Sequence, residues 1–140
     1  MTEEEIIIRC RELTPEIVQL QKSISEQQGG KINLTFFKDS VEYFFPVDNI
    51  LFFETSDRSV DAHTASDIFQ IKYKLYELER LLPRNFIRVS KSTILNISRI
   101  YSIDKNITSS SVVSFEGTYK QIYVSRSYFK ALKQRLDERL

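Results

Sequence analysis

Hydrophobic positions between residues 31 and 72 recur at every second residue, in short runs separated by polar turn signals. β-Branched and aromatic residues dominate these runs, and that combination predicts β-strands with one buried face. The expected strands are 31–38, 41–45, 50–55, 60–64 and 68–72. Because the links are shorter than the dozen or so residues of a parallel crossover, the pattern favours antiparallel pairing.

The period then changes to that of a helix, because Leu75, Leu78 and Leu82 recur at spacings of three and four. Pro83 ends this helix, although no Ser, Thr, Asp or Asn stands just ahead of it as a cap. Further strands are expected at 86–89, 93–97, 100–104, 111–115 and 119–124, with Glu116-Gly117 as a hairpin turn.

Helical patterns also appear at both ends of the chain. Ser125 suits the N-cap of a C-terminal helix, whose apolar stripe is Phe129, Leu132, Leu136 and Leu140. Near the N-terminus, alternation over Ile6–Cys10 predicts a short strand, and Thr14-Pro15 predicts the start of a helix that ends at Gly29-Gly30. The domains expected are a strand-helix extension at 1–30 and a mainly β domain at 31–140.

Composition places the chain among globular proteins of one domain. It has 140 residues, of which 41% are hydrophobic and 28% charged. No apolar run approaches the roughly 20 residues of a membrane helix. The N-terminus is acidic where a secretory signal would be basic, and the lone Cys10 cannot form an internal disulfide. We therefore expect a cytoplasmic protein.

The net charge of +1 conceals an uneven distribution of charge. Residues 1–30 and 31–83 each carry −3, whereas residues 84–140 hold 11 basic against 4 acidic residues, or +7. Such an excess fits a surface that binds a polyanion, and equally a basic surface that is merely solvated.

Motifs of enzymes are missing from the sequence. It has no Gly-x-Ser-x-Gly elbow, no phosphate-binding loop and no dinucleotide fingerprint, and it holds only three glycines. Cys10 and His63 are the sole Cys and His residues, and their spacing matches no metal-ligand pattern. We expect no enzyme activity, no cofactor, no metal site and no small-molecule substrate. His63, inside an expected strand, is interpreted as a structural imidazole.

Three short polar links combine cations with hydroxyl groups. In Ser125-Arg126-Ser127 the arginine stands at the start of an expected helix, where the positive end of the helix dipole disfavours a cation. The placement is favourable if the arginine and the helix N-terminus both face an anion or a guanine edge. Ser90-Lys91-Ser92 and Ser56-Asp57-Arg58-Ser59 have similar composition, suited to a sugar-phosphate backbone. Each link could also be an ordinary polar turn.

Four ordered segments resemble the LytTR family of DNA-binding domains over about residues 35–137. They are Ile50-Leu51-Phe52-Phe53-Glu54, Leu75-Tyr76-Glu77-Leu78-Glu79-Arg80-Leu81-Leu82-Pro83, Phe86-Ile87-Arg88-Val89-Ser90-Lys91-Ser92-Thr93-Ile94-Leu95-Asn96 and Tyr123-Val124-Ser125-Arg126-Ser127-Tyr128-Phe129. The resemblance implies an elongated fold of three small antiparallel sheets with short helices. It also implies a bacterial transcription regulator that reads duplex DNA with loops, in contrast to a recognition helix.

The resemblance also implies the residues that contact DNA and the partners. The DNA-contacting positions fall on Arg58, Ser59, Ser90, Lys91, Ser92 and Arg126. Many members have His-Arg-Ser or His-Asn-Ser at Ser90-Lys91-Ser92, so a backbone contact is the role expected there. The DNA is expected to carry repeated half-sites that can hold two copies of the chain. About 30 N-terminal residues are too few for a receiver domain, which matches stand-alone members, some held inactive by a membrane protein.

Two other functions compete with duplex recognition. A protein-interaction module could use the aromatic strip of Phe36, Phe37, Tyr43, Phe44 and Phe45, although alternation should bury about half of it. Exposed aromatic residues could instead bind single-stranded nucleic acid, with weak sequence preference.

Overall fold

The computed structural model describes residues 32–105 and 110–139, so the expected strand and helix of residues 1–30 lie outside the described residues, as does Leu140. The strands are β1 (Asn33–Lys38), β2 (Val41–Pro46), β3 (Phe52–Ser56), β4 (Ser59–His63), β5 (Ile68–Ile71), β6 (Phe86–Ser90), β7 (Thr93–Asn96), β8 (Ile100–Asp104), β9 (Ser111–Phe115) and β10 (Gln121–Val124). The helices are α3 (Leu75–Leu81) and α4 (Arg126–Arg139), with 3-10 turns η1 (Val47–Asn49) and η2 (Ile97–Arg99).

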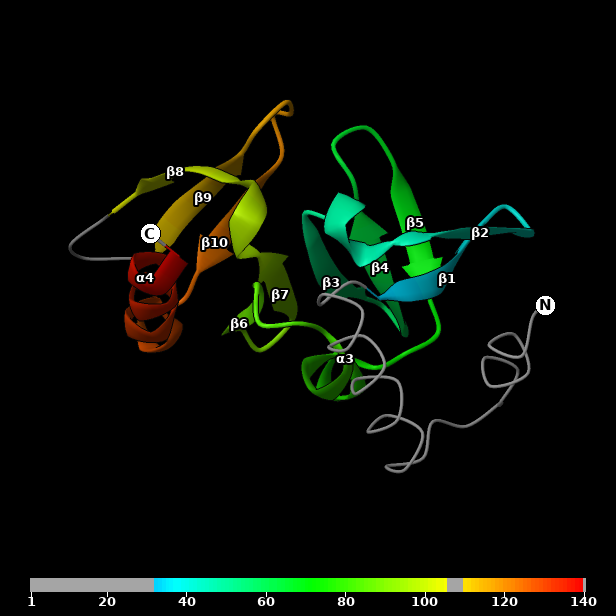
Figure 1. The fold of residues 1–140 in the computed structure, drawn as a ribbon, viewed down its shortest axis with the longest axis horizontal. Coiled ribbons are helices and arrows are strands. Elements are labelled where there is room, and N and C mark those ends of the chain that lie inside the picture. The colour runs from blue at the N-terminus through cyan, green and yellow to red at the C-terminus, as the bar shows by residue number, and fades with distance from the viewer. Residues whose placement is uncertain (1–31, 106–109, 140) are drawn as a thin grey trace.

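These strands form two antiparallel sheets, with orders β2-β1-β5-β4-β3-β7-β6 and β10-β9-β8 (Figure 1). The expected mainly β, antiparallel class with short helices is confirmed. The expected number of three small sheets is wrong for the described residues, which form two. The reason is that β3 pairs with β4 along one side and with β7 along the other, which merges two hairpins into one sheet.

The tight turns fall where the sequence predicts them. Asp39 and Ser40 connect β1 to β2 with positive φ angles of 51° and 69°, the left-handed geometry that matches the twist of a hairpin. Asp57 has a φ of 52° in the β3–β4 turn. Gly117, in the expected Glu116-Gly117 turn, has a φ of 75°, which glycine adopts without strain.

Both helices expected within residues 31–140 are confirmed, and α3 begins after Lys74, without the usual capping side chain, as the sequence indicates. In place of a capping hydroxyl or amide at the N-cap, the Glu77 carboxylate accepts a hydrogen bond from the Lys74 N–H at 2.8 Å. This bond satisfies a donor that the start of a helix leaves unpaired. In α4, Leu132 is fully buried, while Phe129 and Leu136 pack against the core more loosely.

Two hydrophobic clusters hold the fold together. The first lies among β1, β3–β7 and α3, and the second among β3, β6–β10 and α4. Strands β3, β6 and β7 contribute to both, because alternate side chains point to opposite faces. Neighbouring residues are divided between the clusters in the pairs Phe53 and Phe52, Phe86 and Ile87, and Ile94 and Leu95, the first of each pair in the first cluster. This part of the large sheet is therefore covered on both faces.

The aromatic strip of β1 and β2 is split between core and surface. Phe36 is fully buried and stacks on Phe45 with ring centroids 4.3 Å apart. Phe44 is 69% exposed and Tyr43 38% exposed. The strip is thus too divided to form one aromatic surface.

Candidate nucleic-acid interface

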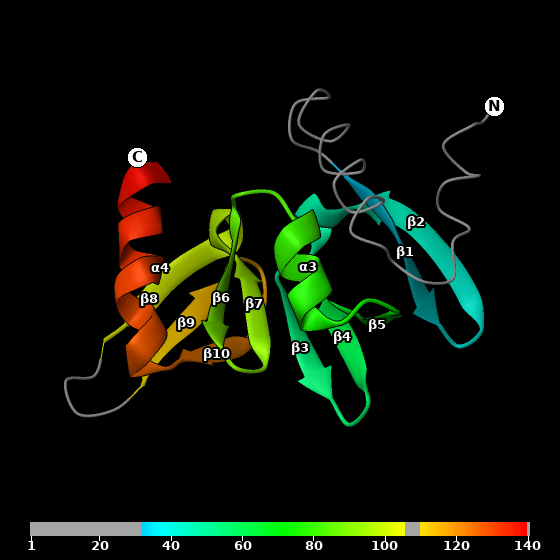
Figure 2. The ribbon, with the colours of Figure 1, turned by 90° about the horizontal axis from the view of Figure 1, so that it is seen from below.

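The three polar links singled out in the sequence lie along one edge of the molecule. The β3–β4 turn, the β6–β7 turn and the junction of β10 with α4 follow one another along the lower edge of Figure 2. Arg58 and Lys91 are 33 residues apart in the chain, and Lys91 and Arg126 are 35 residues apart. Tertiary structure therefore places on one edge the three links that carry Arg58, Lys91 and Arg126.

Hydrogen bonds connect the first turn to the second. The Thr55 N–H donates to the Ser92 carbonyl at 2.9 Å, and the Thr55 hydroxyl donates to the same oxygen at 3.2 Å. Thr55 belongs to β3, two residues before Asp57. The β3–β4 hairpin is thereby held against the turn that carries Lys91.

A β-bulge connects the second turn to the third. The register between β6 and β7 shifts between Arg88 and Ser90, which leaves Val89 without a cross-strand partner. The Val89 carbonyl instead accepts hydrogen bonds from the Ser125 N–H at 3.1 Å and the Ser125 hydroxyl at 3.4 Å. Ser125 directly precedes α4, so the bulge sets where Arg126 begins that helix.

The serines of the candidate site are engaged in local hydrogen bonds. The Ser59 hydroxyl donates to the Ser56 carbonyl at 3.2 Å, closing the first turn. The Ser90 hydroxyl accepts from the Ser92 N–H at 3.2 Å and lies 3.4 Å from the Ser92 hydroxyl. These three serines therefore shape their turns, while the cations stand at the surface.

Most of the basic excess after residue 83 is used within the fold. Three cations form ion pairs: Arg84 with Glu138, Arg88 with Glu79, and Lys133 with Asp137. Three more donate hydrogen bonds to backbone carbonyl oxygens: Arg99 to Asp48, Lys120 to Thr64 and Asp67, and Arg135 to Arg84. Another cation, Lys105, lies over the ring of Phe129.

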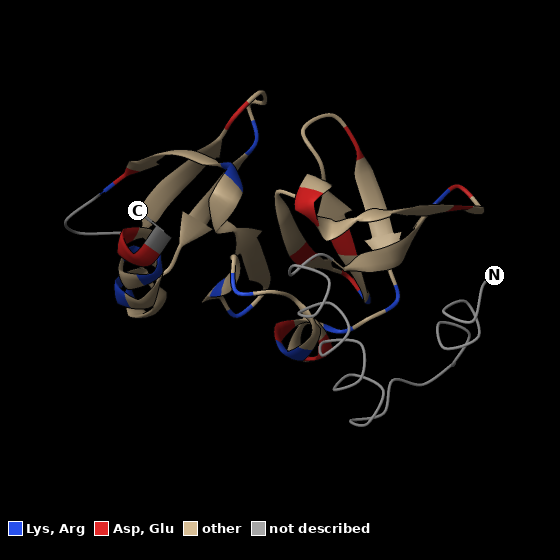
Figure 3. Cartoon of the chain, viewed as in Figure 1, with Lys and Arg blue, Asp and Glu red and all other residues tan. Residues whose placement is uncertain are grey.

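Few cations of this half remain for a partner. Of its basic side chains that the structure describes, Lys91, Arg126 and Lys130 are exposed and make no hydrogen bond or ion pair. All three belong to the β6–β7 turn or to the first half of α4, where basic residues gather in Figure 3. Fewer basic side chains are therefore free to bind a partner than the charge count of residues 84–140 suggests.

The β3–β4 hairpin carries acidic residues instead. Glu54 and Asp61 face each other across the two strands, and the same strands are marked by acidic residues in Figure 3. Partial burial raises the pKa of Glu54, and the neighbouring Asp61 carboxylate raises it further. Arg58, beside Asp57 in the turn, is the exposed cation of this hairpin.

His63 and Lys120 connect the two sheets away from these turns. The His63 ring stacks on Phe52, with centroids 4.2 Å apart, and its Nδ1 lies 3.3 Å from Lys120 Nζ. Burial, and then the Lys120 charge, lowers the pKa of His63 to about 4. Lys120 also donates to the Thr64 carbonyl at 2.9 Å and the Asp67 carbonyl at 3.0 Å. These contacts agree with the structural role expected for His63.

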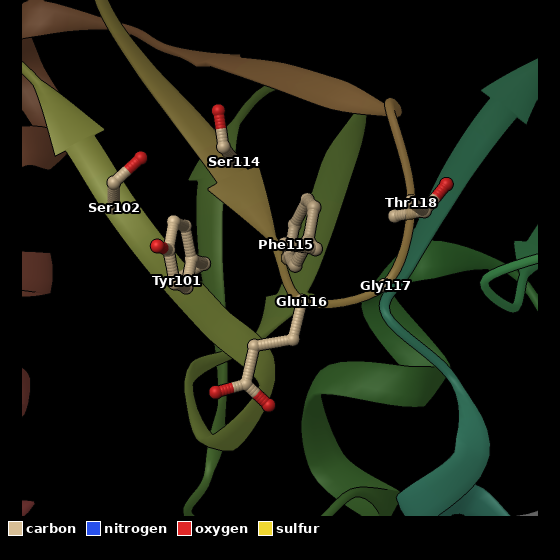
Figure 4. Close-up of a pocket in the computed structure, with 7 residues that line it drawn as sticks. All are labelled: Tyr101, Ser102, Ser114, Phe115, Glu116, Gly117 and Thr118. Carbon is tan, nitrogen blue, oxygen red and sulfur yellow. The ribbon is translucent and has the colours of Figure 1, made fainter.

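A shallow cavity of about 500 Å³ lies on the small sheet (Figure 4). Its lining residues are Tyr101, Ser102, Ser114, Phe115, Glu116, Gly117 and Thr118. The β9–β10 turn contributes to it, so it lies at the opposite end of β10 from Arg126. Glu116 is its single carboxylate, and within residues 32–105 and 110–139 no three Cys, His, Asp or Glu side chains group as metal ligands.

Sequence patterns missed Arg88, which lies beneath the β6–β7 turn and contacts its backbone. Its place in an expected strand gives no signal of this role, because alternation alone would assign it to a solvated face. The bulge at Val89 was missed for the same reason.

Comparison with known proteins identifies the family to which this fold belongs. The profile of the LytTR DNA-binding domain matches residues 40–137. The chain belongs to this family. It is 33% identical over 105 residues to a protein of Staphylococcus aureus strain NCTC 8325 that is named an uncharacterised HTH-type transcriptional regulator, covering 74% of this chain and 69% of that protein. The counterpart in strain MRSA252 is 32% identical over the same length and coverage.

A solved LytTR domain has the same fold. It is the DNA-binding domain of a Bacillus cereus protein described as a methyl-accepting/DNA response regulator, with a TM-score of 0.68 and 26% identity, covering 74% of this chain and 95% of that domain. The chain is thus a LytTR DNA-binding regulator. None of its described helices is both long and apolar enough to cross a membrane.

Proposed function

We propose that this LytTR domain recognises specific sequences in duplex DNA through the β3–β4 turn, the β6–β7 turn and the β10–α4 junction. The observation that carries the proposal is the pair of backbone connections, Thr55 to Ser92 and Ser125 to Val89, that line these turns up along one edge. Such hydrogen bonds hold surface loops in a fixed arrangement, which recognition of a rigid double helix requires.

The order of the elements favours loops over a recognition helix. A helix-turn-helix motif joins its two helices by a turn of three or four residues. Here, within the described residues, α3 and α4 are separated by five strands. Although the relatives in Staphylococcus aureus carry the name HTH-type, this arrangement of helices is better suited to reading DNA with turns.

The exposed cations of the three links have distinct roles. Arg126 reads bases in the major groove, because its guanidinium can donate two hydrogen bonds to guanine and the N–H groups at the start of α4 attract phosphate. Lys91, with Ser90 and Ser92 shaping its turn, binds phosphate or enters the minor groove. Arg58, with Ser59, makes a second major-groove contact.

The proposal includes partners and location. Repeated half-sites on the DNA would align two copies of the chain. As in some members of the family, a membrane protein would hold the regulator inactive, and the site of action is the cytoplasm. The preferred operator sequence follows from the selection experiment below.

Fluorescence titration tests the proposal against its rivals. The wild-type chain selects an operator from a pool of duplexes with a randomised centre, and is then titrated with that duplex, a shuffled duplex and the single strand at two salt concentrations. We expect preference for the selected duplex. Equal affinity for the single strand would favour stacking on exposed aromatics. No binding to any nucleic acid would leave the protein-interaction module, with Phe44 and Tyr43 as the exposed residues of its aromatic strip.

Arg126→Ala should weaken binding to the selected duplex by about 1 to 3 kcal/mol and binding to the shuffled duplex much less, because a bidentate base contact carries discrimination. Lys133→Ala is the matched control, since it removes a cation from the same helix two turns further on. Equal losses on both duplexes would make Arg126 a phosphate contact only.

A further inference from the structure

We propose that Arg88 is a positioning residue that holds the β6–β7 turn in the shape in which Lys91 reaches DNA. The inference rests on the proposed function and adds a residue that contacts the turn from beneath. It concerns the backbone geometry of the DNA-binding turn, whereas Lys91 itself supplies the contact.

The guanidinium of Arg88 binds two successive carbonyl groups of the turn. Its Nε donates to the Ser90 carbonyl at 2.8 Å, and its Nη2 donates to the Lys91 carbonyl at 2.5 Å. A planar guanidinium presents its donors in a rigid fork, so these two bonds set the separation of the two oxygens. A lysine at this place carries the same charge without that fork.

A third donor orients the guanidinium. Nη1 of Arg88 donates to the Glu79 carboxylate of α3 at 2.6 Å, and the Arg88 side chain is only 22% exposed. With all three nitrogen atoms engaged inside the fold, Arg88 is poorly placed to contact a phosphate directly. Its positive charge is balanced by Glu79, and the connection extends from α3 to the turn.

Together these bonds account for four successive carbonyl groups of the turn. The Val89 oxygen accepts from Ser125, those of Ser90 and Lys91 accept from Arg88, and that of Ser92 accepts from Thr55. A carbonyl oxygen that faced DNA would repel the phosphate oxygens. Because Arg88 holds two of the four inward, the turn presents the Lys91 side chain at its surface.

The test compares four variants on the selected duplex and the shuffled duplex at about 0.05 and 0.2 M salt. Lys91→Ala removes the contact, Arg88→Lys keeps the charge and removes the fork, and the double variant combines the two. Arg84→Lys is the matched control. Arg84 also forms an ion pair with a Glu, but it stands before β6, at the other end of that strand from the turn.

We expect Arg88→Lys to reproduce the effect of Lys91→Ala. Each variant should lose the salt dependence that one phosphate contact contributes. Between the two salt concentrations its affinity should therefore fall about 3.5-fold less than that of the wild type. The double variant should bind DNA no more weakly than Lys91→Ala alone, because both single changes remove the same contact between Lys91 and DNA. Arg84→Lys should bind as the wild type does.

Other outcomes overturn the inference. Wild-type binding by a folded Arg88→Lys variant would show that the fork is dispensable, and additive losses in the double variant would show that Arg88 acts independently of Lys91. If Arg88→Lys fails to fold, Glu79→Gln replaces it, and unchanged binding by that folded variant likewise contradicts the coupling. If Lys91→Ala binds as the wild type does, the proposed function fails at this turn instead.

Discussion

Strands β2 and β7 are buried to the opposite extents from those that their sequences suggest. β2, Val41–Pro46, is rich in large apolar side chains, yet none of its six residues is buried. β7, Thr93–Asn96, contains two polar residues, and all four of its residues are buried. β2 lies at the edge of the large sheet, whereas β7 lies between β3 and β6 with a hydrophobic cluster on each face. Burial thus follows position in the sheet more closely than hydrophobicity.

This difference bears on where the turns of the candidate interface are placed. The β6–β7 turn extends from two strands that belong to both hydrophobic clusters, and the β3–β4 turn extends from β3, which belongs to both, and β4, which belongs to the first. A site built on strands that are packed on both faces is held more firmly than one built on an edge hairpin. The β1–β2 hairpin, by contrast, packs one face only, through Phe36 and Phe45.

The largest effect is expected from Leu95→Ala in β7. Leu95 is fully buried, so truncation leaves a cavity and should lower the free energy of unfolding by about 3 kcal/mol. Phe44→Ala in β2 removes a larger side chain that is 69% exposed and should cost less than about 1 kcal/mol. Urea denaturation measures both, and equal losses would contradict the contrast between the two strands.

Asn96→Ala should lower the free energy of unfolding by about 2 kcal/mol, because it leaves buried polar groups unpaired. Asn96 Nδ2 donates to the Ile50 carbonyl at 3.0 Å, and Oδ1 accepts from the Ser98 N–H at 3.0 Å and from Asn85 Nδ2 at 2.8 Å.

Asn33→Ala, at the exposed start of β1, is the control for Asn96→Ala and should change stability by about 0.5 kcal/mol or less. Thermal unfolding measures the loss of stability in each of the two variants. A mild effect of Asn96→Ala would show that the central strands tolerate unpaired polar groups.

The smallest effect is a pH dependence from His63, at the contact between the two sheets. Its pKa is about 4 in the fold and 6.5 in the unfolded chain, so the unfolded state binds the proton more readily. The stabilisation that His63 contributes is fully present above about pH 6.5. It is lost as the pH falls toward 4, which lowers the free energy of unfolding by about 1 kcal/mol because the ring is only half buried.

His63→Gln should remove this component of the pH dependence. The difference in unfolding free energy between wild type and variant, followed by denaturation from pH 7 to 5, should therefore change with pH. A constant difference would mean that His63 does not titrate on unfolding in this range.

Sequence patterns predicted the local elements because periodicity is a local property. Ten strands between residues 31 and 124 and the α3 and α4 helices follow from alternation, leucine spacing and turn residues such as Asp39, Ser40 and Gly117. The LytTR resemblance likewise rests on segments that can be read in order along the chain, and the family is confirmed. The domain boundary near residue 30 and the site residues stay predictions.

Tertiary structure decided which local elements meet, because that depends on pairing between residues far apart in the chain. β3 pairs with β7 across some 40 residues, and so joins what looked like separate sheets. Pairing also buries the two polar residues of β7, exposes Phe44, and gives Arg88 its two carbonyl partners. No local pattern encodes these outcomes, since each is set by the hydrogen bonds and packing that distant strands provide.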